Sequence, residues 1–242
     1  LAELSSFVWL PLILLMVYKK RPILVGIFLG LLMITHNLIF LPFTGIVILW
    51  SLALRKNFVT PIIIAFGLTA FFWLPALLEK QFTLVDQLLI KNLASYKIHF
   101  LCPQQLWYGP WGFGGSVSGC ADGLSFALGK IYFFVIALGF SFALYKKSWI
   151  GIISFIFLVL SLFMTLSYSQ FIWDRIPQLW YLQFPWRFLE FVALFSALLA
   201  GSLNRKLLVF VMIPLVIFIN AKYFAPQKFI PDVTDQKLTS DY

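Results

Sequence analysis

The chain has 242 residues, of which 62% are hydrophobic and only 11% are charged, and its net charge is +9. A soluble domain carries about 25% charged residues, so this composition argues against a soluble enzyme and predicts an integral membrane protein. The basic residues fall in short clusters between apolar runs instead of on one polar face, so we expect no nucleic-acid partner.

Apolar segments of helical length follow one another along the chain, and they predict an all-α, polytopic transmembrane helix bundle. A span needs roughly 20 apolar residues, or fewer where neighbouring protein covers its ends. Residues 22–54 are too long for one span, and the polar triplet Thr35-His36-Asn37 divides them. About eight spans are expected, at residues 5–18, 22–35, 38–54, 58–78, 129–145, 149–167, 188–204 and 207–220.

Basic clusters fix the predicted orientation of this transmembrane domain, which covers residues 1–222. Alternating spans place four clusters on one side, and the positive-inside rule assigns that side to the cytoplasm. The clusters are Lys19-Lys20-Arg21, Arg55-Lys56, Lys146-Lys147 and Arg205-Lys206. We therefore expect a plasma-membrane protein whose loops 79–128 and 168–187 and polar tail 223–242 are extracytoplasmic.

The longest predicted loop contains an irregular stretch, Gln104–Gly129, that is rich in glycine and aromatic residues. Glycine lets other groups approach the backbone closely. Cys102 and Cys120 lie in the same loop, and thiols outside the cytoplasm are oxidised. The pair therefore predicts a disulfide, with two unpaired cysteines as the alternative. Asp122 stands in an Asp-Gly turn signature, which leaves open both a turn role and contact with a substrate or metal.

Polar residues at the outer rim are candidate substrate-binding residues. His36 and Asn37 occur where an apolar run turns, and polar groups at membrane depth are often functional. The alternative is a polar turn in which Asn37 caps the next helix. Arg187 and Arg175 flank the second loop, and arginine donates two parallel hydrogen bonds to phosphate. The alternatives for them are snorkelling or a local ion pair, such as Arg187 with Glu190 three residues on.

Four segments of the chain resemble a known family. They are the triplet Thr35–Asn37, FFWLPALLEK at Phe71–Lys80, the loop Trp111–Gly129, and LQFPWRFLEF at Leu182–Phe191. In this order they resemble the bacterial multi-pass proteins called 6-pyruvoyl-tetrahydropterin synthase-related membrane proteins. These proteins in turn resemble membrane glycosyltransferases with the GT-C fold, including the YfhO-like proteins. We reject pterin synthase activity, because that soluble zinc enzyme needs a histidine cluster and this chain has two distant histidines.

The resemblance implies transfer of a sugar from a polyprenyl-phosphate donor at the outer face of the bacterial cytoplasmic membrane, in assembly of a cell-envelope glycan or glycoprotein. In GT-C enzymes the catalytic acid usually lies in the first extracytoplasmic loop. Because the chain begins at Leu1, we expect that acid upstream, in a longer protein. Arg187 and Arg175 would then bind donor phosphate. The residues that would line the substrate cavity are His36, Asn37, Trp107, Trp111 and Asp122.

The alternative is a non-enzymatic membrane protein, either a transporter or an assembly scaffold for envelope lipids or polymers. Transporters tend to have broken helices and polar residues at mid-membrane, whereas the predicted spans carry almost no charge. Membrane lipid is an expected partner under both hypotheses. No cofactor is identified and no metal site is predicted, because His36 and His99 match no zinc-ligand spacing; nothing in the pattern supports a divalent metal.

Overall fold

The computed structural model describes residues 2–84, 95–109, 112, 114–203 and 206–221. Within these ranges the regular structure is helical and no strand forms, although one isolated bridge pairs Leu101 with Leu166. The predicted all-α class is therefore confirmed. Trp111 and the predicted tail, 223–242, lie outside the described residues.

Seven of the eight predicted apolar segments each form one helix. These helices are α1 (Ala2–Tyr18), α2 (Pro22–Thr35), α3 (Asn37–Ala53), α7 (Lys130–Tyr145), α8 (Trp149–Thr165), α10 (Leu189–Ser202) and α11 (Lys206–Asn220). The two loops between them contain the short helices α6 (Pro103–Trp107) and α9 (Gln170–Arg175) and the 3-10 turns η5 (Pro177–Leu182) and η6 (Pro185–Phe188).

The eighth segment, predicted as a single span at 58–78, is broken. It forms α4 (Val59–Leu68) and α5 (Ala70–Leu78), which meet at Thr69 with a bend of 74°. The Thr69 amide and hydroxyl both donate to the carbonyl of Ala65, at 3.1 and 2.8 Å, and such additional threonine bonds often bend helices. Gly67, a poor helix former, lies just before the break.

The helices are short compared with the thickness of a bilayer. Among the described residues, every unbroken helix falls short of the length and apolar content needed to cross a bilayer by itself, whereas α4 and α5 reach that threshold only when taken together.

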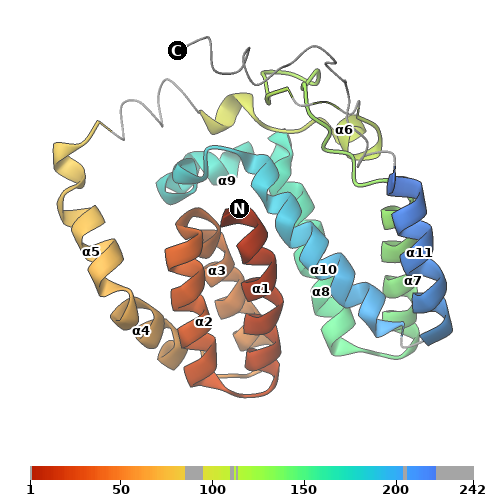
Figure 1. Ribbon diagram of the computed structural model, residues 1–242, viewed down its shortest axis with the longest axis horizontal. Helices are drawn as coiled ribbons and strands as arrows, with labels where there is room; N and C mark the ends of the chain where they lie inside the picture. Colours follow the sequence, from red (N-terminus) through yellow and green to blue (C-terminus); the bar gives the residue numbers. More distant parts are fainter. Residues whose placement is uncertain (1, 85–94, 110–111, 113, 204–205, 222–242) are drawn as a thin grey trace, which may run out of the picture.

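The helices form two groups that share one interface. In the first group α2 contacts α1, α3 and α4, and in the second α10 contacts α7 and α8. Contacts of α1 with α10 and of α3 with α8 join the groups. Figure 1 shows α6, α9 and the start of α1 at one end of the molecule and the α1–α2 and α7–α8 turns at the opposite end.

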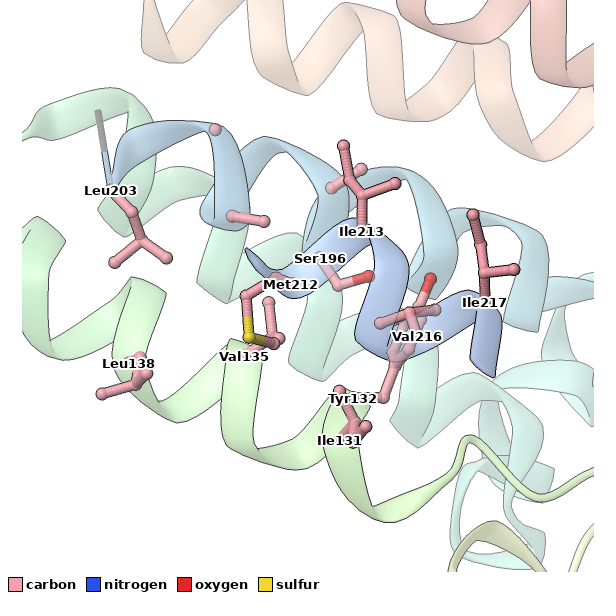
Figure 2. Close-up of a pocket in the computed structure, with 13 residues that line it drawn as sticks. Ile131, Tyr132, Val135, Leu138, Ser196, Leu203, Met212, Ile213, Val216 and Ile217 are labelled. Carbon is pink, nitrogen blue, oxygen red and sulfur yellow. The ribbon is translucent and has the colours of Figure 1, made fainter. Parts of the chain in front are cut away.

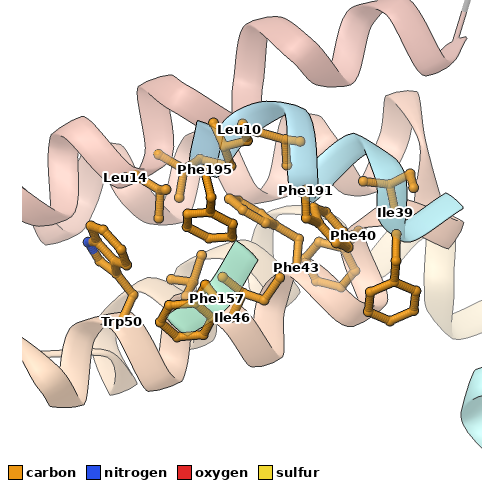
Figure 3. Packing of buried hydrophobic residues seen from close by; sticks show 14 of the residues in the cluster. Leu10, Leu14, Ile39, Phe40, Phe43, Ile46, Trp50, Phe157, Phe191 and Phe195 are labelled. Carbon is orange, nitrogen blue, oxygen red and sulfur yellow. The ribbon is translucent and has the colours of Figure 1, made fainter. Parts of the chain in front are cut away.

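Aromatic side chains fill the interface between the groups. Phe43 of α3 stacks on Phe191 of α10 with ring centroids 5.8 Å apart, and Phe157 of α8 stacks on Phe195 at 5.2 Å. Trp50 completes the cluster at 5.9 Å from Phe195 (Figure 3). Such pairs contribute about 0.5–1.5 kcal/mol each beyond the area they bury, so the two groups form one core.

Three helices end in tight turns that place a cation in the left-handed region. Lys20, Arg55 and Lys147 have φ values of 56°, 52° and 51°. After each of them the next amide donates back into the preceding helix, as Ser148 does to the carbonyl of Ala143 at 2.8 Å. Glycine is the usual residue at such a position, so the basic character of these turns is not required by their geometry.

Candidate functional site

A charged cluster lies where α1 begins, where α2 passes into α3, and where η6 leads into α10. Oε1 of Glu3 is 3.4 Å from Nε of Arg187 and 3.8 Å from Nε2 of His36. The Glu3 side chain is 51% exposed, whereas those of His36 and Arg187 are 8% and 14% exposed. The structure thus brings together two of the residues selected from the sequence, through an acid that the sequence analysis did not select.

His36 owes its position to the break between α2 and α3. Its Nδ1 accepts a hydrogen bond from the Ile39 amide at 3.2 Å, so His36 is the N-cap of α3. The capping role proposed for Asn37 is therefore wrong: Asn37 is the first residue of the helix and its side chain is exposed. Because Nδ1 accepts, a neutral His36 ring carries its proton on Nε2, which faces Glu3.

Burial and the Arg187 charge together lower the pKa of His36 below its ordinary value, and Glu3 opposes them. The imidazole is therefore biased toward its neutral form. Burial also lowers the pKa of the Arg187 guanidinium, again against the effect of Glu3. Glu3 thus contributes most to compensating the buried charge of Arg187, and Glu190 adds a smaller effect.

The segment that precedes η6 holds the Arg187 side chain through one backbone carbonyl and one aromatic ring. Its Nη1 donates to the carbonyl of Leu182 at 2.8 Å, and the guanidinium lies 5.2 Å from the ring centroid of Phe184. Gln183, between Leu182 and Phe184, has φ of 64°, so the chain turns sharply between the two residues that contact the guanidinium. The local pair of Arg187 with Glu190 is replaced by the contact with Glu3.

Glu190 lies in the first turn of α10 and instead accepts a hydrogen bond from the buried hydroxyl of Ser6 in α1. A carboxylate is favoured at the positive end of a helix. Sequence reasoning missed Glu3 and Ser6 as site residues. The available signal was that these polar residues begin an apolar segment on the same predicted side as His36 and Arg187.

The glycine-rich stretch is held by a disulfide and by one buried carboxylate. Cys102 and Cys120 are bonded, with their Cα atoms 5.6 Å apart. Asp122, only 6% exposed, accepts from Nε2 of Gln105 at 2.6 Å and from the Val117 amide at 2.7 Å. Gln105 in turn accepts from the Cys102 amide at 2.7 Å. These contacts give Asp122 a structural role within the loop.

Two segments of this stretch cross with almost no space between them. The Gly114 amide donates to the carbonyl of Gly123 at 2.9 Å, and the Gly123 amide donates to the carbonyl of Gly115 at 3.0 Å. A Cβ at Gly114 would lie 2.5 Å from the Cα of Gly123. The crossing therefore requires glycine at both positions.

The stretch packs against the segment that carries Arg187. Nδ1 of His99 lies 3.0 Å from Oγ of Ser116, and its ring is 4.7 Å from that of Phe184. Phe126 lies 5.4 Å from Trp186, next to Arg187 in sequence. Burial lowers the pKa of His99, against the effect of Asp122. The glycine-rich stretch thus packs beside the segment that carries Arg187.

Other predicted site residues lie apart from this cluster. Arg175 is exposed and donates from Nη1 to the Phe171 carbonyl at 3.0 Å. Its neighbour Asp174 accepts from the Tyr96 hydroxyl instead of pairing with it. Trp107 is 54% exposed and lies 5.3 Å from Phe133. In the described part of the chain, no hydrogen bond or ion pair joins Arg175, Trp107 or Asn37 to Glu3.

An apolar cavity of about 450 Å³ lies between α7, α10 and α11 (Figure 2). Its walls are almost wholly hydrocarbon, from side chains such as Val135, Leu138 and Ile213. The hydroxyl of Ser196 at its edge is occupied by the carbonyls of Val192 and Ala193. The cavity therefore suits a hydrocarbon chain and offers little to a polar ligand.

Within the described residues, no group of three or more His, Cys, Asp or Glu side chains is placed to hold a metal ion. Comparison with protein-family models, curated proteins and solved structures finds no match for this chain. The family resemblance therefore stays a prediction, and the cluster is the feature of the described residues that bears on function.

The cluster has a definite chemical capacity. Glu3 is a half-exposed carboxylate held between a buried guanidinium and a neutral imidazole. Such a carboxylate can accept a proton from a hydroxyl group that approaches from solvent. Once Glu3 is protonated, the Arg187 charge loses its main compensating acid and can stabilise an anion such as phosphate.

Proposed function

We propose that the chain is part of a polytopic membrane glycosyltransferase of the GT-C type, which transfers a sugar from a polyprenyl-phosphate donor at the extracytoplasmic face of a bacterial cytoplasmic membrane. The observation that carries the proposal is the contact of Glu3 with Arg187, 3.4 Å apart and next to a neutral His36. It joins a proton acceptor to a phosphate-binding group at one end of the helices.

Exposed apolar side chains support the membrane location. No residue of α5 is buried, and its Phe71 is 71% exposed; in α11 Phe218 is 80% exposed. Contiguous exposed apolar faces are rare on soluble monomers but are expected against lipid. The seven apolar segments that form one helix each have 14–17 residues, or about 21–26 Å, so local bilayer thinning or neighbouring protein would have to cover their ends.

The distribution of charge supports the orientation. The start of α1, α6 and α9 lie at one end of the molecule, and the α1–α2 and α7–α8 turns lie at the other (Figure 1). The positive-inside rule then assigns the cluster to the outer face. The hydrocarbon-lined cavity beside α11 fits the expectation that membrane lipid is a partner.

In the proposed reaction the acceptor hydroxyl attacks the anomeric carbon of the donor sugar. A bond forms between that carbon and the acceptor oxygen, and the bond to the phosphate oxygen breaks, with its electron pair leaving on the polyprenyl phosphate. Glu3, in place of the upstream acid expected from the resemblance, takes the hydroxyl proton. Its neutralisation frees the charge of Arg187, which then stabilises the departing phosphate.

Transfer assays with the full-length protein and a panel of polyprenyl-phosphate sugars test this function. Glu3→Gln and Arg187→Ala are each expected to lower the rate by about 100-fold or more. Arg175→Ala, which removes an exposed arginine of the same loop, is the matched control and should change it less than about twofold. No transfer by the unaltered protein, or equal effects of the two arginine substitutions, would overturn the proposal.

A transporter is the second candidate, and one observation favours it. The bend of 74° at Thr69 breaks the α4–α5 segment, and broken helices are typical of transporter sites. A transporter would move a lipid-linked substrate across vesicles without transferring its sugar. Flux without transfer in reconstituted vesicles would therefore favour this candidate over the enzyme.

A further inference from the structure

A second cavity lies at the opposite end of α1 from Glu3. It has a volume of about 310 Å³ and lies between the α1–α2 turn and the α3–α4 turn. Two segments distant in sequence thus build one site. The lining residues are Val17, Lys20, Arg21, Pro22, Val25, Arg55, Lys56 and Asn57.

The charge of this cavity is entirely positive. Its walls carry four cations, Lys20, Arg21, Arg55 and Lys56, and no acid. No salt bridge within the described ranges uses any of the four. Unpaired cations held close together repel one another and gain energy from a shared anion. The arginines add planar forks that match the geometry of phosphate.

Apolar side chains also line the cavity and lie beside it in sequence. Val17 and Val25 are only 3% and 1% exposed and form the floor. Tyr18 and Ile23, which follow the lining residues Val17 and Pro22 in sequence, leave 57% and 62% of their surface exposed. A ligand with an anionic head and hydrocarbon chains could satisfy both parts, whereas a free phosphate would satisfy only the cations.

We propose that this cavity binds the phosphate headgroup of an anionic phospholipid. Basic pockets between helices at the cytoplasmic face bind such headgroups in membrane proteins generally. The bound headgroup would tie the α1–α2 turn to the α3–α4 turn, and its acyl chains would run along the exposed side chains of α1 and α2. The inference rests on the membrane location proposed above, and it concerns the face opposite to the Glu3–Arg187 cluster.

The test uses the full chain purified in a neutral detergent. Native mass spectrometry measures binding of phosphatidylglycerol and of phosphatidylcholine, and thermal unfolding measures the effect of inorganic phosphate. The Arg21→Ala/Arg55→Ala variant removes two cations of the cavity. The Lys146→Ala/Lys147→Ala variant is the matched control, because it removes the same charge from the α7–α8 turn, which lines no part of the cavity.

Phosphatidylglycerol should bind in preference to phosphatidylcholine. The cavity variant should lose about tenfold or more of that affinity, as expected for two cations near a headgroup, and the control should keep it within about twofold. Three results would overturn the inference: no preference between the lipids, an equal loss in both variants, or stabilisation by inorganic phosphate equal to that by phosphatidylglycerol. The unfolding midpoint of each variant without lipid establishes that it is folded.

Carbonate extraction of cell membranes separates this inference from the membrane location on which it rests. Release of the chain by carbonate would refute the membrane location itself. Retention of the chain together with any of the three contrary binding results would refute only the headgroup site.

Discussion

Oε1 of Glu3 lies 3.4 Å from Nε of Arg187, so the first turn of α1 is tied to the turn that leads into α10. The same guanidinium holds the carbonyl of Leu182 at 2.8 Å. Arg187→Ala should therefore destabilise the protein by about 1–3 kcal/mol, because a hydrogen bond from a charged donor and the contact with Glu3 are both lost. Thermal unfolding in detergent measures the change.

The matched control for this prediction is Arg175→Ala, since the Arg175 side chain is exposed. We expect a change within about 0.5 kcal/mol, as is usual at the surface. Equal destabilisation by both substitutions would show that the contacts of Arg187 contribute no more than a surface residue does.

Burial of both histidines predicts an acid-sensitive fold. The pKa values of His36 and His99 lie below the ordinary 6.5. Between each folded pKa and 6.5 the unfolded chain binds more protons, so stability is fully present above about pH 6.5 and falls as the pH drops. Unfolding midpoints at about pH 7.5 and pH 5.5 measure the effect. The His36→Gln/His99→Gln variant should show a smaller difference between them, and an unchanged difference would contradict the account.

The crossing in the glycine-rich stretch allows a test with two adjacent residues. A Cβ at Gly114 meets the backbone of Gly123, whereas a Cβ at Gly115 meets nothing within 4 Å. Gly114→Ala should therefore cost about 1–3 kcal/mol of local stability, and Gly115→Ala should cost little. Limited proteolysis of the loop, with the disulfide intact, compares the two variants. Faster cleavage of Gly115→Ala than of Gly114→Ala would contradict the crossing.

The left-handed turn at Lys147 gives a further matched pair. Lys147 has φ of 51°, whereas Lys146 before it has φ of −82°. Both glycine substitutions remove one cation from the end of α7, so their difference isolates the backbone effect. Lys147→Gly should leave the protein about 1–2 kcal/mol more stable than Lys146→Gly. The reverse order in thermal unfolding would contradict the described turn.

Most helices could be predicted from the sequence, because long apolar runs with polar interruptions depend only on local composition. The break at Thr69 could not, since the predicted segment 58–78 carries no charge and its two threonines look alike in sequence, although only Thr69 lies at the bend. The N-cap of α3 is His36 and not the neighbouring Asn37. Asn is the commoner cap residue, but in the folded chain Nδ1 of His36 lies within hydrogen-bond distance of the Ile39 amide.

The cluster itself was predicted only in part. His36 and Arg187 carried a local signal as polar residues at the ends of apolar runs. Glu3 became part of the site only through the packing of α1 against α2 and α10, which the sequence does not specify. Arg175 is exposed to solvent, although it too is an arginine beside aromatic residues in the second loop.

The account depends above all on a membrane that separates the cluster and the glycine-rich stretch from the basic turns. Cysteine labelling with a membrane-impermeant reagent in intact cells tests this directly, using Lys56→Cys in the α3–α4 turn and Ser116→Cys in the glycine-rich stretch. The native Cys102–Cys120 disulfide leaves no other free thiol. We expect labelling of the cysteine at 116 in intact cells and of the cysteine at 56 only after the membrane is permeabilised. Labelling of both from the same side would contradict the account.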